Sequence, residues 1–259
     1  MKLWDKNNSV NEKIIEFTVG DDRLNDLYLI KYDIKASISH AKMLYRSNLL
    51  SESECDKIIN ILNEILIHAE AGELKIEKEF EDMHSKIEYI LTDKLGDIGK
   101  KIHTARSRND QVLVSIQLYL IDELNFIKTE VKSLFDLLIN LAKKNKNIIM
   151  PGYTHMRAAM PSSFGLWFSA YAEILIDDVI SLNSTIEIIN QNTLGSAAGY
   201  GTSFNIDRDF TTNDLNFKTL KYNSLACQIS RNKIEKNTFD TLGNIAFTLS
   251  KISMDICLY

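Results

Sequence analysis

RNDQVLVSIQLYLIDELNFIKTEVKSLFDLLINLAKK, residues Arg108–Lys144, is the stretch that decides the fold class of this chain. Nine apolar residues follow one another in it at steps of three or four positions: Leu113, Ile116, Leu120, Leu124, Ile127, Val131, Leu134, Leu138 and Leu141. Eight steps over 28 residues give a period of about 3.5, which is typical of helices packed in a left-handed bundle. Further apolar residues widen the stripe, so this helix is predicted to meet neighbours on several sides.

Two further apolar stripes of the same kind follow. One runs from Phe164 to Ile189, and the other begins near Arg231 and continues to Tyr259, the last residue. No helix-stop signal precedes Tyr259, so the chain is expected to end in the middle of a helix.

The chain as a whole is poor in helix-breaking residues. It holds 2 prolines and 10 glycines in 259 residues, and few of its segments alternate apolar with polar residues. Shorter amphipathic helices are predicted at residues 24–47, 51–71 and 81–95. We therefore predict an all-α fold, with a smaller helical domain over residues 1–105 and a long-helix bundle over residues 106–259, incomplete at its C-terminal end.

Composition excludes several classes of protein. Hydrophobic residues make up 45% and charged residues 25%, which is the balance of a soluble globular protein. A net charge of -5 argues against a dedicated nucleic-acid binder. Three scattered cysteines do not form a disulfide framework. The amino terminus lacks the apolar core of a signal peptide, and no apolar run reaches the ~18 residues of a membrane span, so a cytoplasmic protein without membrane contact is expected.

The segment HTARSRNDQ, residues 103–111, carries more polar groups than a bundle helix needs at its start. Ser107, followed three residues later by a carboxylate, resembles an N-cap, so the segment is read either as helix capping with exposed arginines or as an anion site. A helix amino terminus offers free N–H groups and a partial positive charge. Arg106 and Arg108 add forked donors that suit carboxylates, and Asn109 adds an amide.

The segment PGYTHMRAAMP, residues 151–161, holds both prolines of the chain. An irregular backbone is therefore expected between two long helices, with Thr154 and His155 in the break. A lone histidine is more often structural than catalytic, but one held at a rigid break between bundle helices is a candidate for proton transfer.

Two other polar segments have weaker interpretations. LGSAAGYGTSF, residues 194–204, has no preceding β-strand, so a turned loop that brings N–H groups to a substrate is favoured over a dinucleotide site. In EDMHSKIE, residues 81–88, one pair formed by His84 and Glu88 gives little support for a metal, with Asp82 as a third candidate ligand. A polar network is favoured there, and no metal site is predicted.

The motifs HTARSRNDQV, PGYTH…AMP and LGSAAGYG resemble those of the argininosuccinate lyase family, in the fumarase/aspartase superfamily. EDMHSKIE and the early run YDIKASISHAKML extend the resemblance over nearly the whole chain. It is closest to the branch with FTVG near the amino terminus and MPSSFGLWF after the histidine motif, here Phe17–Gly20 and Met160–Phe168. The resemblance implies a homotetramer with a bundle of twenty helices, whose active sites each combine segments of three subunits.

The resemblance also implies a reaction, the cleavage of argininosuccinate into arginine and fumarate by a carbon–nitrogen lyase of arginine biosynthesis that uses no metal or organic cofactor. By motif, His155 corresponds to the family's proton-transfer histidine and Thr154 to a residue that contacts the substrate. The implied substrate-binding residues are Ser107, Arg108, Asn109 and Arg231.

The sequence departs from the family pattern at several positions. Met156, Arg157 and Met160 replace the usual Leu, Gln and Gln of the histidine motif, Thr193 replaces a proline, and Asp22 aligns with a substrate-binding serine. The family's flexible serine loop, which supplies the other proton-transfer residue, should follow Tyr259. The chain is therefore expected to be truncated, and by itself inactive and prone to aggregate.

Two alternatives remain open at this point. One is another lyase of the superfamily, of the aspartase, fumarase or adenylosuccinate lyase type, against which HTARSRNDQ argues. The other is a non-catalytic helical structural protein like the crystallins, against which the intact set of His155, Thr154, Asn109 and Arg108 argues.

Overall fold

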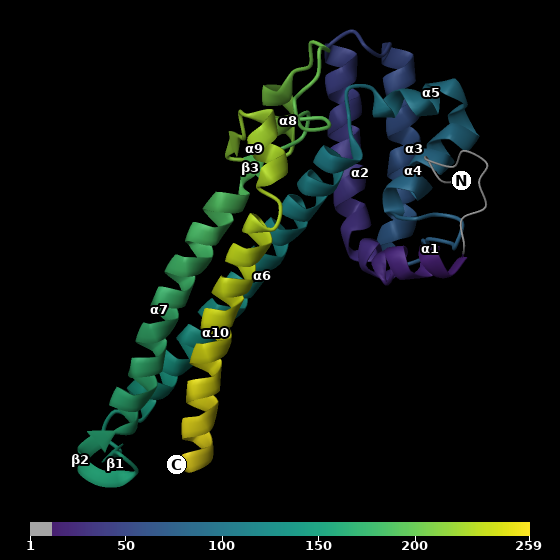
Figure 1. Ribbon diagram of the computed structural model, residues 1–259. Helices are drawn as coiled ribbons and strands as arrows, with labels where there is room; N and C mark the ends of the chain where they lie inside the picture. Colours follow the sequence, from purple (N-terminus) through teal and green to yellow (C-terminus); the bar gives the residue numbers. More distant parts are fainter. Residues whose placement is uncertain (1–11) are drawn as a thin grey trace. The chain divides into compact units, whose positions relative to one another are not determined.

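The computed structural model describes residues 12–259 and is predominantly helical, which confirms the predicted all-α fold (Figure 1). Three helices are long: α6 Arg108–Lys144, α7 Phe164–Ile189 and α10 Lys233–Leu258. They correspond to the three apolar stripes. The prediction that the amino terminus is not a signal peptide concerns residues 1–13, of which 1–11 lie outside the described residues.

The remaining elements are shorter. The helices are α1 Glu12–Val19, α2 Asp22–Arg46, α3 Glu52–Glu70, α4 Met83–Leu95, α5 Asp97–Lys100, the 3-10 helix η1 Lys101–His103, α8 Arg208–Asp214 and α9 Ser224–Ile229. The strands are β1 Ile149–Thr154, β2 Arg157–Ser163, β3 Gln191–Asn192 and β4 Thr219–Leu220. The predicted helices at 24–47, 51–71 and 81–95 correspond to α2, α3 and α4.

The chain divides into two compact units. The first comprises residues 1–119 and 190–231, and the second comprises residues 120–189 and 232–259. Helix α6 contributes to both units, because its first residues belong to the first and the rest to the second. The predicted domain boundary near residue 105 stays a prediction.

The first unit contains an apolar core under α2, α3 and α4. Its fully buried side chains include Ile34, Leu44, Ile58, Leu62 and Leu91. They recur at helical spacing on the inner faces of these helices, and their removal from water favours the packed state.

Side-chain caps fix where two helices of the first unit begin. Ser51 and Glu54 form a reciprocal capping box at the start of α3, with Ser51 N–H donating to Glu54 Oε2 at 3.0 Å. Asp82 caps α4 by accepting the N–H of Ser85 at 2.7 Å. Such caps satisfy backbone N–H groups that the helix itself leaves without partners.

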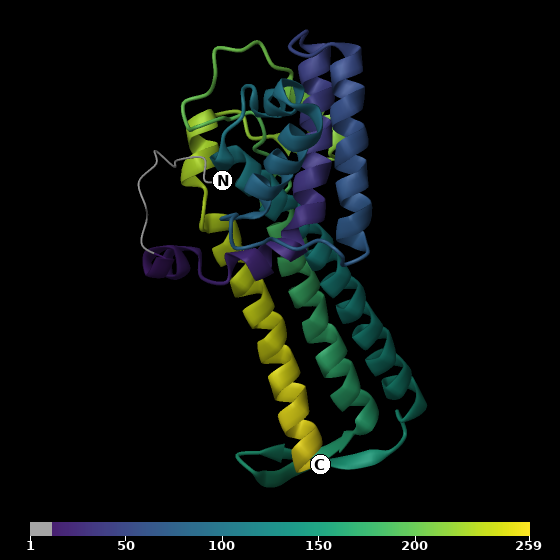
Figure 2. The same ribbon diagram turned by 90° about the vertical axis from the view of Figure 1, so that its right-hand side faces the viewer.

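In the second unit, α7, α10 and the later part of α6 run side by side in both views (Figures 1 and 2). Polar contacts tie α7 to α10 at two levels. Asp255 accepts hydrogen bonds from Trp167 Nε1 at 3.1 Å and from Tyr171 Oη at 2.5 Å, and Thr185 bonds Thr241 at 2.7 Å.

A β-hairpin joins α6 to α7 where an irregular segment is expected from the sequence, so that expectation is wrong. Strands β1 and β2 pair antiparallel, Pro151 lies opposite Pro161, and the register shifts between Gly152 and Tyr153. The prolines are tolerated because this ribbon has two strands only, so each strand has a free edge on which no N–H partner is needed.

None of the helices in residues 12–259 is long and apolar enough to span a membrane.

Protonation of one buried histidine makes the fold sensitive to acid. His40 on α2 is fully buried, and its Nε2 donates to the carbonyl oxygen of Thr104 at 2.9 Å. Burial, with the nearby Arg106 charge, lowers the pKa of His40 from 6.5 to about 3. Because the folded pKa lies below the unfolded one, the stability gained from neutral His40 is present above pH 6.5 and is lost as the pH falls toward 3.

We therefore expect His40 to contribute a loss of up to about 1.4 kcal/mol of stability per pH unit as the pH falls from 6.5 to 4.5. Burial raises the pKa of Asp26 to about 6, which contributes in the opposite direction below pH 6, so the His40 contribution is measured as the difference between wild type and variant in urea unfolding of the complete protein at several pH values. His40→Gln should lose less stability over this range than the wild type, whereas His68→Gln, at an exposed histidine paired with Glu73, should follow the wild type. An equal slope in the wild type and His40→Gln would contradict the assignment.

Candidate functional site

The N-terminus of α6 is closed by its own side chains and still presents polar groups to solvent. Ser107 Oγ accepts the N–H of Asn109 at 3.3 Å, and Asp110 Oδ1 accepts the N–H of Ser107 at 2.9 Å. The capping interpretation of Ser107 and Asp110 is therefore correct. The side chains of Ser107, Arg108 and Asn109 are partly exposed there, at the positive end of a helix of 37 residues.

The two arginines that flank Ser107 have different surroundings. Arg106 is buried and donates to Ser37 Oγ at 3.0 Å and to Asp33 Oδ1 at 3.4 Å, so the expectation that it presents a free guanidinium to an anion is wrong. Arg108 is half-buried, with Nη1 3.4 Å from Asp82 Oδ1. Only Arg108 of the two keeps a partly exposed side chain at the helix start, and its Nη2 donates to Ser85 Oγ at 3.4 Å.

Asp33 lies beneath this helix start and was not singled out by any sequence pattern. It is fully buried and accepts hydrogen bonds from Gln111 at 3.1 Å and Ser115 at 3.3 Å, in addition to Arg106. Burial raises the pKa of the Asp33 carboxyl, while the charge of Arg106 and these hydrogen bonds counteract that rise. The carboxylate thus fixes the first turns of α6 against α2.

The EDMHSKIE segment belongs to the same polar surroundings. His84 Nδ1 lies 3.1 Å from Asp33 Oδ1, and Glu88 lies 3.0 Å from His103 Nδ1. Asp82 is used as the cap of α4. Within residues 12–259, no group of three or more His, Cys, Asp or Glu side chains is arranged to hold a metal ion. Each of these three residues thus has a polar partner in the protein, as a polar helix face or network requires.

The glycine segment that follows Asn192 is anchored to the start of α6. Gly195 N–H and Ala197 N–H both donate to Asp110 Oδ2, at 2.9 and 3.0 Å. Both N–H groups are therefore engaged by the protein. The expectation that this loop brings N–H groups to a substrate is wrong for these two groups. Burial raises the pKa of the Asp110 carboxyl, and the N–H of Ser107 is the largest of the influences that lower it.

The two proposed catalytic residues lie at the tip of the β1–β2 hairpin. Thr154 ends β1, and His155 and Met156 form the two-residue turn before Arg157. All four side chains are exposed. His155 and Met156 have φ of 50° and 62°, as a type I′ turn requires, although Asn-Gly is the usual pair there. Their left-handed backbone is strained, and such strain often accompanies function.

The structure brings together some of the predicted site residues and separates others along the chain. Ser107, Arg108 and Asn109 are neighbours, and Thr154 and His155 are neighbours. The first group belongs to the first unit and the second group to the second unit, and the 37 residues of α6 lie between them in the sequence. Arg231 has an exposed side chain in the turn that follows α9.

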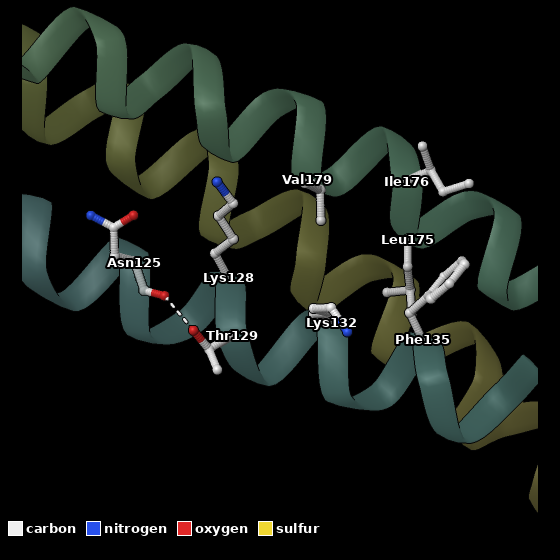
Figure 3. A pocket seen from close by; sticks show the side chains of 8 residues that line it. All are labelled: Asn125, Lys128, Thr129, Lys132, Phe135, Leu175, Ile176 and Val179. Atoms are coloured by element: carbon white, nitrogen blue, oxygen red, sulfur yellow. Dashed lines mark hydrogen bonds between the residues drawn. The ribbon is translucent and has the colours of Figure 1, made fainter.

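A cavity of about 410 Å³ lies between α6 and α7 in the second unit (Figure 3). Two of its lining residues are lysines that already have partners, since Lys128 donates to Asn183 at 2.7 Å and Lys132 to Asp136 at 2.5 Å. Its other lining residues are Asn125, Thr129, Phe135, Leu175, Ile176 and Val179. They include no carboxylate or imidazole, so this cavity lacks a group for proton transfer.

Comparison with known proteins relates the chain to one family. Residues 16–259 match the family model described as lyase. The argininosuccinate lyase of Phocaeicola vulgatus is 50% identical over 258 residues, which are 100% of this chain and 58% of that protein. The argininosuccinate lyase of Thermotoga neapolitana is 44% identical, over 100% of this chain and 65% of that protein. The chain thus spans less than two thirds of these relatives.

Solved structures show the same fold. A variant of EDDS lyase with bound fumarate has a TM-score of 0.82 and 23% identity, over 98% of this chain and 50% of that one. The class II fumarase of Schistosoma mansoni has a TM-score of 0.78 and 17% identity, over 100% of this chain and 62% of that one. These likenesses confirm the predicted fumarase/aspartase-like arrangement of helices.

The Asp33–Arg106 pair gives a testable prediction about stability. Arg106→Met keeps an unbranched side chain but leaves the buried Asp33 carboxylate without its cation, and removing one partner of a buried pair costs about 3–5 kcal/mol. Urea unfolding of the complete protein measures the loss. Lys100→Met is the control, because its pair with Asp97 is exposed and contributes at most about 1 kcal/mol. Equal losses in the two variants would show that the Asp33–Arg106 pair does not hold this region.

Proposed function

The chain belongs to the lyase family, and from this premise we propose that the complete protein is an argininosuccinate lyase. It would split argininosuccinate into arginine and fumarate. The observation that carries the proposal is the start of α6, where the HTARSRNDQ motif is held in a fixed geometry by two buried carboxylates. The names of the relatives that match the whole chain support the same activity.

The start of α6 suits the dicarboxylate half of this substrate. The helix terminus provides partial positive charge, Arg108 provides the positive charge of a partly exposed side chain, and Ser107 and Asn109 provide neutral hydrogen-bonding groups. We assign these three residues to substrate binding. Arg231, an exposed cation in the same unit, is assigned to binding on the family resemblance.

The proposed reaction is an elimination. A base takes a proton from the carbon beside a succinyl carboxylate, the bond from the neighbouring carbon to the guanidinium nitrogen breaks, and the double bond of fumarate forms. The intermediate carries added negative charge on that carboxylate, so preorganised donors stabilise it. We assign proton transfer to His155 and a substrate contact to Thr154. No metal or organic cofactor enters this proposal.

The proposed active site combines several copies of the chain. In the sequence, the 37 residues of α6 lie between the binding strip and the hairpin tip, which belong to different units. Exposed apolar side chains on the long helices of the second unit support assembly: Phe126, Leu137, Ile176, Ile180, Phe239, Phe247 and Ile256. Because soluble monomers rarely expose so much apolar surface, a partner that covers it is expected. We propose a homotetramer in which the hairpin of one copy completes the site at the α6 start of another.

The role of His155 is tested by substitution in the complete protein. His155→Asn should lower kcat for argininosuccinate about 100-fold or more, because general acid–base groups contribute about 10²–10⁴. Fumarate release, followed by ultraviolet absorbance, measures the rate. Met156→Leu, the family's usual residue beside it in the same turn, should stay within a few fold of wild type. Near-normal turnover by His155→Asn would remove this histidine from the mechanism.

The shared site is tested by mixing subunits. Asn109→Ala and His155→Asn should each be inactive alone, because each removes one half of every site. In tetramers assembled at random from equal amounts of both, about a quarter of the sites combine two intact halves, so about a quarter of the activity should return. If mixed tetramers form and remain inactive, Asn109 and His155 do not combine from different copies. They then either act in a site of the same copy or take no part in a site.

A further inference from the structure

The carboxylate of Asp110 accepts hydrogen bonds from one residue close to it in the sequence and from two that are remote. Its Oδ1 accepts the N–H of Ser107 three residues earlier, which closes the cap of α6. Its Oδ2 accepts the N–H groups of Gly195 and Ala197, which lie 85 and 87 residues further along the chain. The side chain is fully buried, so water does not compete for these three hydrogen bonds.

The backbone of the glycine segment is shaped to make this contact. Ala197 has φ of 55°, a left-handed conformation that a residue with a Cβ atom adopts at a cost of about 1–2 kcal/mol. Gly195 has φ of 82°, and a Cβ atom there would lie 2.9 Å from Arg208 Cγ. The backbone is therefore strained at Ala197, and no side chain larger than that of glycine fits at Gly195. In this conformation both N–H groups reach Asp110.

Two further side chains hold the other side of the same segment. Arg208 Nε donates to the carbonyl oxygen of Leu194 at 2.9 Å. Gln228 Nε2 donates to Ser196 Oγ at 2.9 Å and to the carbonyl oxygen of Ala197 at 3.1 Å. With the N–H groups on Asp110 and the oxygens on Arg208 and Gln228, residues 194–197 are fixed on both sides. Asp110 links them to α6, and Gln117 of the same helix holds the preceding Thr193.

We propose that Asp110 is a positioning residue, which ties the strip Ser107–Asn109 to the buried glycine segment 194–197 and so fixes the strip in the geometry that binds substrate. This inference rests on the proposed lyase function for its kinetic consequence but not for the anchor itself. Asp110 does not contact the substrate. It acts through the strip, because Ser107 and the glycine segment are bound to opposite oxygens of one carboxylate and so keep a fixed separation.

The test compares Asp110→Asn with Glu54→Gln in the complete protein. Both remove a carboxylate at the third position of a helix whose N-cap serine donates to it, but Glu54 has no contact with the glycine segment. An amide offers one acceptor oxygen where the carboxylate offers two, so Asp110→Asn cannot satisfy both Ser107 and the segment. Hydrogen exchange should then speed up about 10- to 100-fold at the Gly195 and Ala197 amides, and Glu54→Gln should leave them unchanged.

The second part of the test measures the kinetics of argininosuccinate cleavage. Asp110→Asn should lower kcat/KM about 10- to 100-fold at a temperature where it is fully folded, since small misplacements of binding groups have effects of this size. The pKa values of its pH–rate profile should stay those of the wild type, because Asp110 transfers no proton. Glu54→Gln should remain within twofold. A folded Asp110→Asn protein with wild-type kcat/KM would overturn the proposal.

A measurement on the wild type covers the case in which Asp110→Asn does not fold. The Gly195 and Ala197 amides should be protected from exchange as strongly as the Ser107 amide, although they lie outside helices. Exchange at the rate of an unstructured loop would overturn the proposal. If the wild type does not cleave argininosuccinate, the proposed function fails, and the exchange result still decides whether the anchor exists.

Discussion

Two buried carboxylates determine the geometry at the start of α6. Asp33 binds Arg106 and the next turn of the helix from below, and Asp110 joins the helix cap to the glycine segment. A charge held away from water is costly unless hydrogen bonds and an opposite charge surround it, and both carboxylates have such partners. Because the partners come from distant parts of the chain, the first unit has to fold correctly before the polar strip at Ser107–Asn109 takes its shape. Binding geometry and folding thus depend on the same contacts.

The helix start and the histidine turn belong to different units of the chain, and the 37 residues of α6 lie between them in the sequence. The long helices of the second unit also expose apolar side chains, and an apolar face of this extent usually packs against another surface. The proposed assembly of several copies would bury these helix faces and bring the histidine turn of one copy to the helix start of another.

Local pattern was enough to predict the long helices, because their apolar residues recur at a period set by helix geometry. It also identified Ser107 as a cap and the polar strip beside it. It failed where the contact partner is remote in sequence: Asp33 and Arg106 are 73 residues apart, and the second oxygen of Asp110 binds a segment 85 residues away. The hairpin escaped prediction for another reason. Its prolines are atypical of strands, and His155-Met156 is an atypical residue pair for a type I′ turn, so neither strand shows by itself that the two strands pair.

We propose that the binding strip of one copy and the hairpin tip of another form one lyase site. A crystal structure of the complete protein with bound fumarate would show this site. A fumarate carboxylate should lie within hydrogen-bond distance of Asn109 from one copy and of Thr154 from a different copy, with His155 of that second copy beside the ligand. Fumarate bound by residues of a single copy, or bound away from the start of α6, would contradict it.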